Sequence, residues 1–358
     1  MRIFMRLGAI LQKLGMCSEV DVLRLLINRK LPMRASDLIV KETLFDTVPV
    51  RVYASKSSRA ENRRGLVWIH GGGGLFGSLE SYQRLCHFFA KESATVIVCI
   101  GYPLAPEHPY PAQQVSCYAA VLHFLKNAQD YGVDPERIVL GGDSSGGSIV
   151  AAISQQLVSR KDLPRVKAHV LLYPYVQTLD SNLPSYQQNH SVPLLFKRHA
   201  VTFFMLYLTG SDIGVDGVMA NAHLSQEVRA KYQKWVSPDH IPQEFKVRGY
   251  VPFVPSLFSE DLFRLYERSF EPRLSPLLAE DAILRQFPKT FLLTCEYDIF
   301  RDDGLLYKRR LEENGVAVTW HHLEDGFHGI SLMIGLGPME FPGTRRNLQR
   351  VLQFLERF

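Results

Sequence analysis

The 358-residue sequence has little that would direct it to a metal ion, a nucleic acid or a membrane span. Its five cysteines form no Cys-x-x-Cys pair, which argues against a structural zinc site, and nothing else in the sequence calls for a cofactor. The net charge is only +5 and no basic block stands out, so we expect no nucleic-acid partner. No apolar stretch reaches the roughly 20 residues of a membrane-spanning helix.

What remains is the composition of a globular protein. Hydrophobic residues make up 46% of the chain and charged residues 22%, which suits a sizeable core. The length fits one large domain or two modest ones. We find no internal repeat and no low-complexity linker that would divide the chain.

Apolar runs rich in β-branched residues alternate with amphipathic segments. We expect a hairpin at 40–54 and strands at 65–70, 95–100, 137–140, 168–173, 290–295 and 316–323. We expect helices at 3–14, 19–30, 111–126, 144–158, 302–313 and 345–357. This alternation predicts an α/β fold with a mostly parallel central sheet flanked by helices.

Two parts of the chain lie outside that alternation. Residues 177–285, approximately, are rich in proline and aromatic residues, and we interpret them as a helical lid inserted into a main domain at 36–358. Residues 1–35 are predicted to be N-terminal helices. Apolar residues of the helix at 3–14 share one face, as in a helix that packs on its own domain as part of the lid, the commoner case. The alternative is a helix that lies on a membrane surface.

Two glycine-rich stretches carry the chemical signal: residues 70–74 (HGGGG) and residues 142–147 (GDSSGG). The second places Ser144 in a Gly-x-Ser-x-Gly frame directly after an expected strand. Small residues at Gly142 and Gly146 let the chain turn sharply into a helix, so that the serine hydroxyl stands clear of the sheet. Ser144 is therefore the candidate nucleophile, and the frame favours it over the neighbouring Ser145.

The first stretch predicts an oxyanion hole, the set of donors that stabilises the negative oxygen formed when the serine attacks. We expect the N–H groups of Gly71 and Gly72 to act together with the N–H of Ser145. Gly73 supports the same motif. His70 is expected to shape the loop; as an alternative catalytic base it would stand on the oxyanion side.

A serine nucleophile needs a base, and the base needs an orienting acid. The acid is expected after the strand at 290–295, where Asp298 begins the strand-end loop. Glu296 lies in or near that strand. Asp302 or Asp303 is expected to cap the helix that follows.

The base is expected after the last strand of the alternation. His328 follows it between two glycines, whereas His321 and His322 lie within the strand. The resulting order, Ser144, Asp298, His328, is the Ser…Asp…His order of α/β hydrolases.

These residues support a family resemblance over nearly the whole chain, from about residue 36 to its end. The chain resembles the hormone-sensitive-lipase branch of α/β hydrolases and, within it, the arylacetamide deacetylase-like proteins. The matching segments are WIHGGG at 68–73, LAPEH at 104–108, GDS at 142–144, SYQ at 185–187, LSPL at 274–277, CEYD at 295–298, LLY at 305–307 and DGFHG at 325–329. The resemblance implies an α/β-hydrolase fold, the same triad and oxyanion positions, and a lid built from the N-terminal helices and the middle insertion.

The sequence departs from the family pattern at three places beside the motifs. The family usually has a bulky residue at Gly74, an arginine at Pro103 and an alanine at Ser145. We expect Gly74 to widen or loosen the acyl pocket, and Pro103 to remove a charge beside the site. None of the three belongs to the triad.

The resemblance also bears on location and covalent modification. It implies a Cys86–Cys295 disulfide, and it implies an N-terminal anchor in the endoplasmic reticulum membrane with the catalytic domain on the lumenal side. Asn189 stands in the sequon Asn-His-Ser, a candidate N-glycosylation site. No anchor segment is found in this chain, so a shortened, soluble form is an open alternative.

Two functions from different classes follow. The first is a serine carboxylesterase, or lipase-like deacetylase, which acts on apolar acyl or aryl esters, including arylacetamides and acylglycerols as candidate substrates. The second is a catalytically silent protein of the same fold that binds a small apolar ligand under the lid. The presence of His328 favours the enzyme, because loss of the base is the simplest route to a silent protein.

Overall fold

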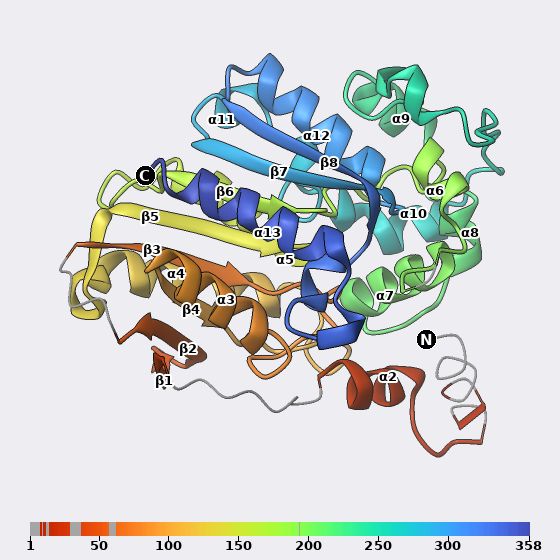
Figure 1. Ribbon diagram of the computed structural model, residues 1–358. Coiled ribbons are helices and arrows are strands. Elements are labelled where there is room, and N and C mark those ends of the chain that lie inside the picture. The colour runs from red at the N-terminus through yellow and green to blue at the C-terminus, as the bar shows by residue number, and fades with distance from the viewer. Residues whose placement is uncertain (1–7, 9, 12–13, 29–36, 57–61, 193) are drawn as a thin grey trace.

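The computed structural model describes residues 8, 10–11, 14–28, 37–56, 62–192 and 194–358. Their centre is a twisted eight-stranded sheet in the order β1-β2-β4-β3-β5-β6-β7-β8 (Figure 1). The strands are β1 (Leu38–Phe45), β2 (Val48–Ser55), β3 (Arg63–Ile69), β4 (Val96–Ile100), β5 (Val133–Asp143), β6 (Ala168–Leu172), β7 (Lys289–Tyr297) and β8 (Val318–Phe327). Every expected strand is present, and β5 and β8 extend beyond their predicted bounds.

The sheet is mixed but mostly parallel, as predicted. β1 and β2 form an antiparallel hairpin that turns at residues 46–47, and β2 runs antiparallel to β4. All other neighbouring strands are parallel. The carboxyl ends of the parallel strands therefore meet at one edge of the sheet, where ligands bind in open α/β sheets.

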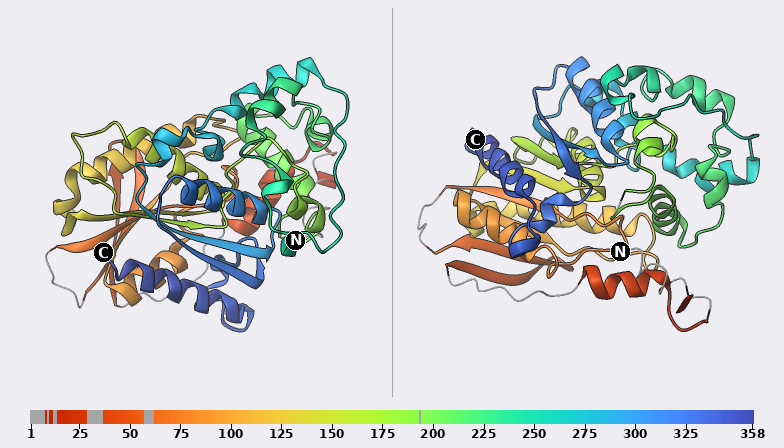
Figure 2. Two further views of the ribbon diagram at one scale, coloured as in Figure 1. Left: turned by 90° about the horizontal axis from the view of Figure 1, so that it is seen from above. Right: turned by 45° about the vertical axis from the view of Figure 1, so that its right-hand side comes forward.

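Helices cover both faces of the sheet (Figure 2). The helices are α2 (Glu19–Ile27), α3 (Gln83–Ser93), α4 (Ala112–Asn127), α5 (Ser145–Leu157), α6 (Pro184–Gln188), α7 (Lys197–Thr209), α8 (Val215–Met219), α9 (Gln226–Tyr232), α10 (Glu260–Tyr266), α11 (Asp281–Leu284), α12 (Arg301–Glu313) and α13 (Pro342–Leu355). α4, α5 and α12 share one apolar core with the sheet, and α3 and α13 share a second core on the opposite face. None of the described helices is both long and apolar enough to cross a bilayer.

The structure confirms most of the predicted helices and adds one. α4, α5, α12 and α13 lie where the apolar stripes placed them. α3 was not predicted, although Leu85, Phe88 and Phe89 form its buried face. α2 accounts for the helix expected at 19–30. The helix expected at 3–14 falls largely on residues outside the described part of the chain.

The segment between β6 and β7, which we call the lid insertion, contains helices α6 to α11. α2 packs with α7 and α8 in a separate apolar cluster, which also contains Leu75 and Phe76 just beyond the HGGGG stretch. We call α2 and the lid insertion together the lid. Segments far apart in the sequence thus meet above the carboxyl edge of the sheet.

Candidate active site

Ser144 lies on a sharp turn between β5 and α5. Its backbone has φ 51° and ψ −126°, a conformation that L-residues rarely adopt. The turn needs glycine on both sides: a Cβ on Gly146 would lie 2.1 Å from the carbonyl oxygen of Ile69, and one on Gly142 would lie 2.6 Å from the carbonyl carbon of Gly146. The backbone therefore has the strained strand-to-helix turn that exposes a nucleophile.

His328 bridges the serine and an acid. It follows β8 directly, and its Nε2 lies 2.8 Å from Ser144 Oγ. Its Nδ1 lies 2.8 Å from Asp298 Oδ2. Because an ionised carboxylate only accepts hydrogen bonds, Nδ1 donates to Asp298, which leaves Nε2 to accept from the serine hydroxyl. The structure thus brings together all three predicted triad residues in the geometry of a nucleophile, a base and an orienting acid.

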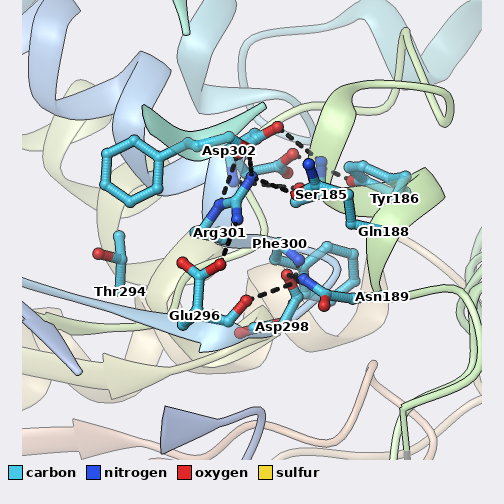
Figure 3. Close-up of polar contacts among 12 residues, drawn as sticks. Ser185, Tyr186, Gln188, Asn189, Thr294, Glu296, Asp298, Phe300, Arg301 and Asp302 are labelled. Atoms are coloured by element: carbon cyan, nitrogen blue, oxygen red, sulfur yellow. Dashed lines mark hydrogen bonds and ion pairs between the residues drawn. The ribbon is translucent and has the colours of Figure 1, made fainter. Parts of the chain in front are cut away.

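The acid is fixed by the lid insertion. Asp298 is 1% exposed, and its Oδ1 accepts from the N–H of Phe300 at 2.9 Å. The side-chain amide of Asn189, which follows α6, donates to the carbonyl oxygens of Asp298 and Glu296 at 2.9 and 3.0 Å (Figure 3). Asn189 is fully buried. The loop that carries the acid is therefore held from both the sheet and the lid.

The other acidic side chains of this region have different partners. Burial opposes ionisation of Glu296, but hydrogen bonding from His322 and the charges of Arg301 and Arg248 outweigh it and lower its pKa to about 2. Asp302 accepts from Arg301 at 2.9 Å and from the N–H of Ser185 at 2.7 Å. Neither side chain contacts the base.

Asp303 has the same kind of role. It accepts from Tyr186 and Gln177 of the lid insertion at 3.0 Å each, and burial raises its pKa well above the ordinary value. The expectation that Asp302 or Asp303 caps α12 is wrong. The cap position is Phe300, and both carboxyl groups lie in the first turn of the helix, where they accept hydrogen bonds from the lid insertion.

Arg301 completes this connection between the lid and the sheet. Its guanidinium is fully buried and donates to Glu296 at 3.0 Å, to Gln188 at 3.0 Å and to the carbonyl oxygen of Phe245 at 2.7 Å (Figure 3). A buried charge is tolerated when its hydrogen-bonding capacity is met in this way. This network could not be predicted from the sequence, because Gln188 and Phe245 are distant from Arg301 in the chain.

The structure contradicts one of the three predicted oxyanion donors and leaves the other two as predictions. The N–H of Gly71 donates to Asp143 Oδ1 at 3.1 Å and to the Tyr82 hydroxyl at 3.0 Å, so its assignment as an oxyanion donor is wrong. The N–H groups of Gly72 and Ser145 have no acceptor among the described residues, and both residues line the cavity described below. Those two assignments stay predictions that the geometry allows.

Asp143 anchors the oxyanion loop, a role that the sequence reasoning missed. Its carboxyl is buried beneath the loop, where it accepts from Gly71 and also from the Tyr82 hydroxyl at 2.8 Å. Burial raises its pKa to about 6, although both hydrogen bonds act in the opposite direction. Asp143 lies directly before the nucleophile in the GDS motif, and this position was the sequence feature that could have indicated its role.

His70 has the structural role expected of it. Its ring stacks on Tyr102 with centroids 4.0 Å apart, and its Nδ1 lies 2.8 Å from the carbonyl oxygen of Gly71. Burial lowers its pKa to about 4, so the ring is neutral and Nδ1 donates to that oxygen. It shapes the loop and makes no hydrogen bond to Ser144, which removes it as an alternative base.

A cavity of about 380 Å³ lies against Ser144 and His328. Its apolar walls include Leu23 and Ile27 of α2, Phe203, Phe204 and Tyr207 of α7, Phe300, and Leu332 and Met333 beyond His328. The expectation that Gly74 widens this pocket is wrong. A Cβ on Gly74 would lie 2.4 Å from the ring of Tyr207, so the lid fills that space.

The expected disulfide is not formed, and all five cysteines are free. Cys86 on α3 contacts Cys99 on β4, and their hydrogen bond together with burial raises the Cys86 pKa. Cys295 lies on β7, four strand positions from β4, and is not paired with Cys86.

The glycosylation assignment is also wrong for the folded chain. Asn189 is 0% exposed, and the nitrogen that would carry the glycan donates to Glu296 and Asp298 instead. An N-linked sugar needs an exposed acceptor amide. The sequon therefore marks a structural asparagine.

Comparisons with known proteins identify the family of the chain. A family model described as the alpha/beta hydrolase fold matches residues 66–234 and 253–332. Arylacetamide deacetylase-like 4 from Homo sapiens is 43% identical over 98% of this chain and 86% of its own length. Arylacetamide deacetylase from Oryctolagus cuniculus is 42% identical over 83% of this chain and 76% of its own length.

Solved structures show the same fold. A carboxyl esterase from the fungus Tuber melanosporum has a TM-score of 0.69 and 21% identity, and covers 92% of this chain and 89% of its own. A bacterial heroin esterase has a TM-score of 0.68 and 24% identity, and covers 94% and 89%. With the triad geometry and the curated relatives, the chain belongs to the arylacetamide deacetylase-like proteins of the hormone-sensitive-lipase branch of α/β hydrolases.

Proposed function

We propose that this protein is a serine carboxylesterase for apolar acyl or aryl esters, with arylacetamides and acylglycerols among the candidate substrates. The observation that carries the proposal is the continuous hydrogen-bonded chain from Ser144 through His328 to Asp298, with both donor–acceptor distances at 2.8 Å. It lies at the wall of an apolar cavity large enough for a small ester.

The mechanism follows from these positions. Ser144 Oγ attacks the substrate carbonyl carbon while its proton passes to His328 Nε2, and Asp298 stabilises the resulting imidazolium. The N–H groups of Gly72 and Ser145 stabilise the oxyanion. His328 then gives the proton to the leaving alcohol or amine, and the acyl group stays on Ser144. Water, deprotonated by His328, attacks the acyl-enzyme, and His328 then returns the proton to Ser144 Oγ as the acid leaves.

The test is turnover of aryl esters of increasing acyl length and of an aryl acetamide by the intact chain and by Ser144→Ala. We expect hydrolysis by the intact chain, covalent labelling of Ser144 by a serine-directed phosphonate, and loss of both in the variant. Ser159→Ala is the matched control, because Ser159 lies in an exposed turn beyond α5.

Two results would contradict the proposal. If the intact chain shows neither turnover nor labelling, the alternative of a silent protein that binds a small apolar ligand replaces the enzyme. Full activity in His328→Ala would show that another group acts as the base.

A further inference from the structure

Ser145 places a hydroxyl where the family usually has an alanine. Its Oγ accepts a hydrogen bond from the N–H of Gly73 at 2.9 Å. Among the described residues no other hydrogen bond of this side chain is found. A hydroxyl that accepts one hydrogen bond still has its own proton to donate. Because Ser145 lines the cavity, that proton is available to a ligand beside Ser144.

The hydrogen bond changes which donors of the glycine loop face the substrate. The N–H of Gly71 is occupied by Asp143 and Tyr82. The N–H of Gly73 donates to Ser145 Oγ, so the loop N–H groups without an acceptor in the described part of the chain are those of Gly72 and Gly74. The N–H of Gly73 therefore acts on a ligand in the cavity only indirectly, through the Ser145 hydroxyl to which it donates. Hydrogen bonds in such a chain polarise one another, so the O–H of Ser145 becomes a better donor.

We propose that the Ser145 hydroxyl is a side-chain donor of the oxyanion hole, alongside the backbone N–H groups of Gly72 and Ser145. It rests on the proposed esterase function and extends it. Gly73 then acts through Ser145 rather than on the substrate. A developing oxyanion is a stronger acceptor than a neutral group, so the hydroxyl donates to it most strongly in the transition state.

The test compares Ser145→Ala with Ser145→Thr, which keeps a hydroxyl, and with Ser159→Ala as the matched control. One donor of an oxyanion hole is worth about 100- to 1000-fold in kcat. We expect Ser145→Ala to lose about that factor in kcat with little change in KM, and Ser145→Thr to recover most of it. Ser159→Ala should match the wild type.

A second readout separates this role from a structural one. An aryl trifluoromethyl ketone forms a tetrahedral oxyanion adduct with the serine, whereas the product alcohol binds without any oxyanion. We expect Ser145→Ala to lower the affinity for the ketone by the same factor by which it lowers kcat. The affinity for the alcohol should stay unchanged. Equal weakening of both ligands would show a structural role and overturn the proposal.

The sign of the activity change is equally decisive. If Ser145→Ala is as active as the wild type or more active, the hydroxyl only competes with the oxyanion for Gly73, and the proposal fails. Absence of turnover and of Ser144 labelling in the wild type would instead contradict the proposed function. Thermal melting of each variant shows whether a loss of activity is caused by unfolding. If Ser145→Ala does not fold, Ser145→Thr decides: a kcat near the wild-type value supports the proposal, and a strongly lowered kcat in a folded variant overturns it.

Discussion

Asp143 combines an acidic side chain with a buried position next to the nucleophile. Its pKa of about 6 exceeds the ordinary value of 3.8, so the folded state favours the protonated form. The unfolded chain ionises first as pH rises, and stability from this group is therefore full below about pH 4 and lost as pH rises through 6. The difference corresponds to about 3 kcal/mol.

Asp143→Asn removes this dependence. The amide oxygen can accept from Gly71 and the amide nitrogen can donate to Tyr82, so the loop keeps both contacts. We expect the wild type to lose stability relative to the variant as pH rises from 4 to 7. The difference between their free energies of unfolding should change by up to about 3 kcal/mol over this range. Urea denaturation of both proteins across this range measures it; parallel curves would contradict the raised pKa.

Asn189 is the second residue whose role the structure redefines. Asn189→Ala removes the donor to the carbonyls of Asp298 and Glu296 and leaves them buried without it. We expect a loss of about 1–3 kcal/mol in the free energy of unfolding together with a lower kcat, because the acid loop is loosened. Gln286→Ala, which removes an exposed amide hydrogen bond, is the control.

The same site gives a direct check of the modification state. When the chain is made in a secretory host, mass spectrometry should find Asn189 without a glycan. A sugar on Asn189 of active protein would contradict its buried position.

Among the elements, α7 of the lid sets the size of the cavity at Gly74. The ring of Tyr207 lies where a side chain at residue 74 would stand. Tyr207→Ala should enlarge the cavity and raise kcat/KM for bulky esters relative to acetate several-fold. The ratio of kcat/KM over an acyl series measures this, with Tyr207→Phe as the control that keeps the ring. An unchanged ratio would show that this wall does not limit substrate size.

Strand and helix periodicity predicted most of the sheet, and the strand ends predicted the triad, because both signals are local in the sequence. α3 was missed because it has no start signal in the sequence: its N-cap residue Tyr82 makes no side-chain cap hydrogen bond, and its first turn has no acidic residue. The donors of the oxyanion loop could not be separated by sequence. Which N–H faces the substrate depends on Asp143, Tyr82 and Ser145, and that is a matter of three-dimensional contact.

At the scale of the whole molecule, Arg24 links α2 to the loop beside the site. Arg24 donates to the carbonyl oxygens of Leu75 and Ala105 at 2.8 and 2.5 Å and pairs with Glu107 at 2.6 Å. Leu75 ends the glycine loop, so the position of α2 is coupled to the oxyanion hole.

Arg24→Ala should release α2 from the glycine loop. We expect KM for apolar esters to rise several-fold, because Leu23 and Ile27 no longer hold their places in the cavity wall. Steady-state kinetics measures it. Arg264→Ala, which removes an exposed pair within α10, should leave KM unchanged. An unaltered KM in Arg24→Ala would show that the other contacts of α2 hold it in place without Arg24.

The buried contacts around α6 also limit how a substrate enters. Asn189 holds the acid loop, Ser185 and Tyr186 bind Asp302 and Asp303, and Arg301 reaches back to Gln188. Raising this end of the lid would release the triad acid from its support. We therefore expect α6 to stay in place while a substrate enters, so that Asp298 keeps its support and its hydrogen bond to His328 as the cavity fills.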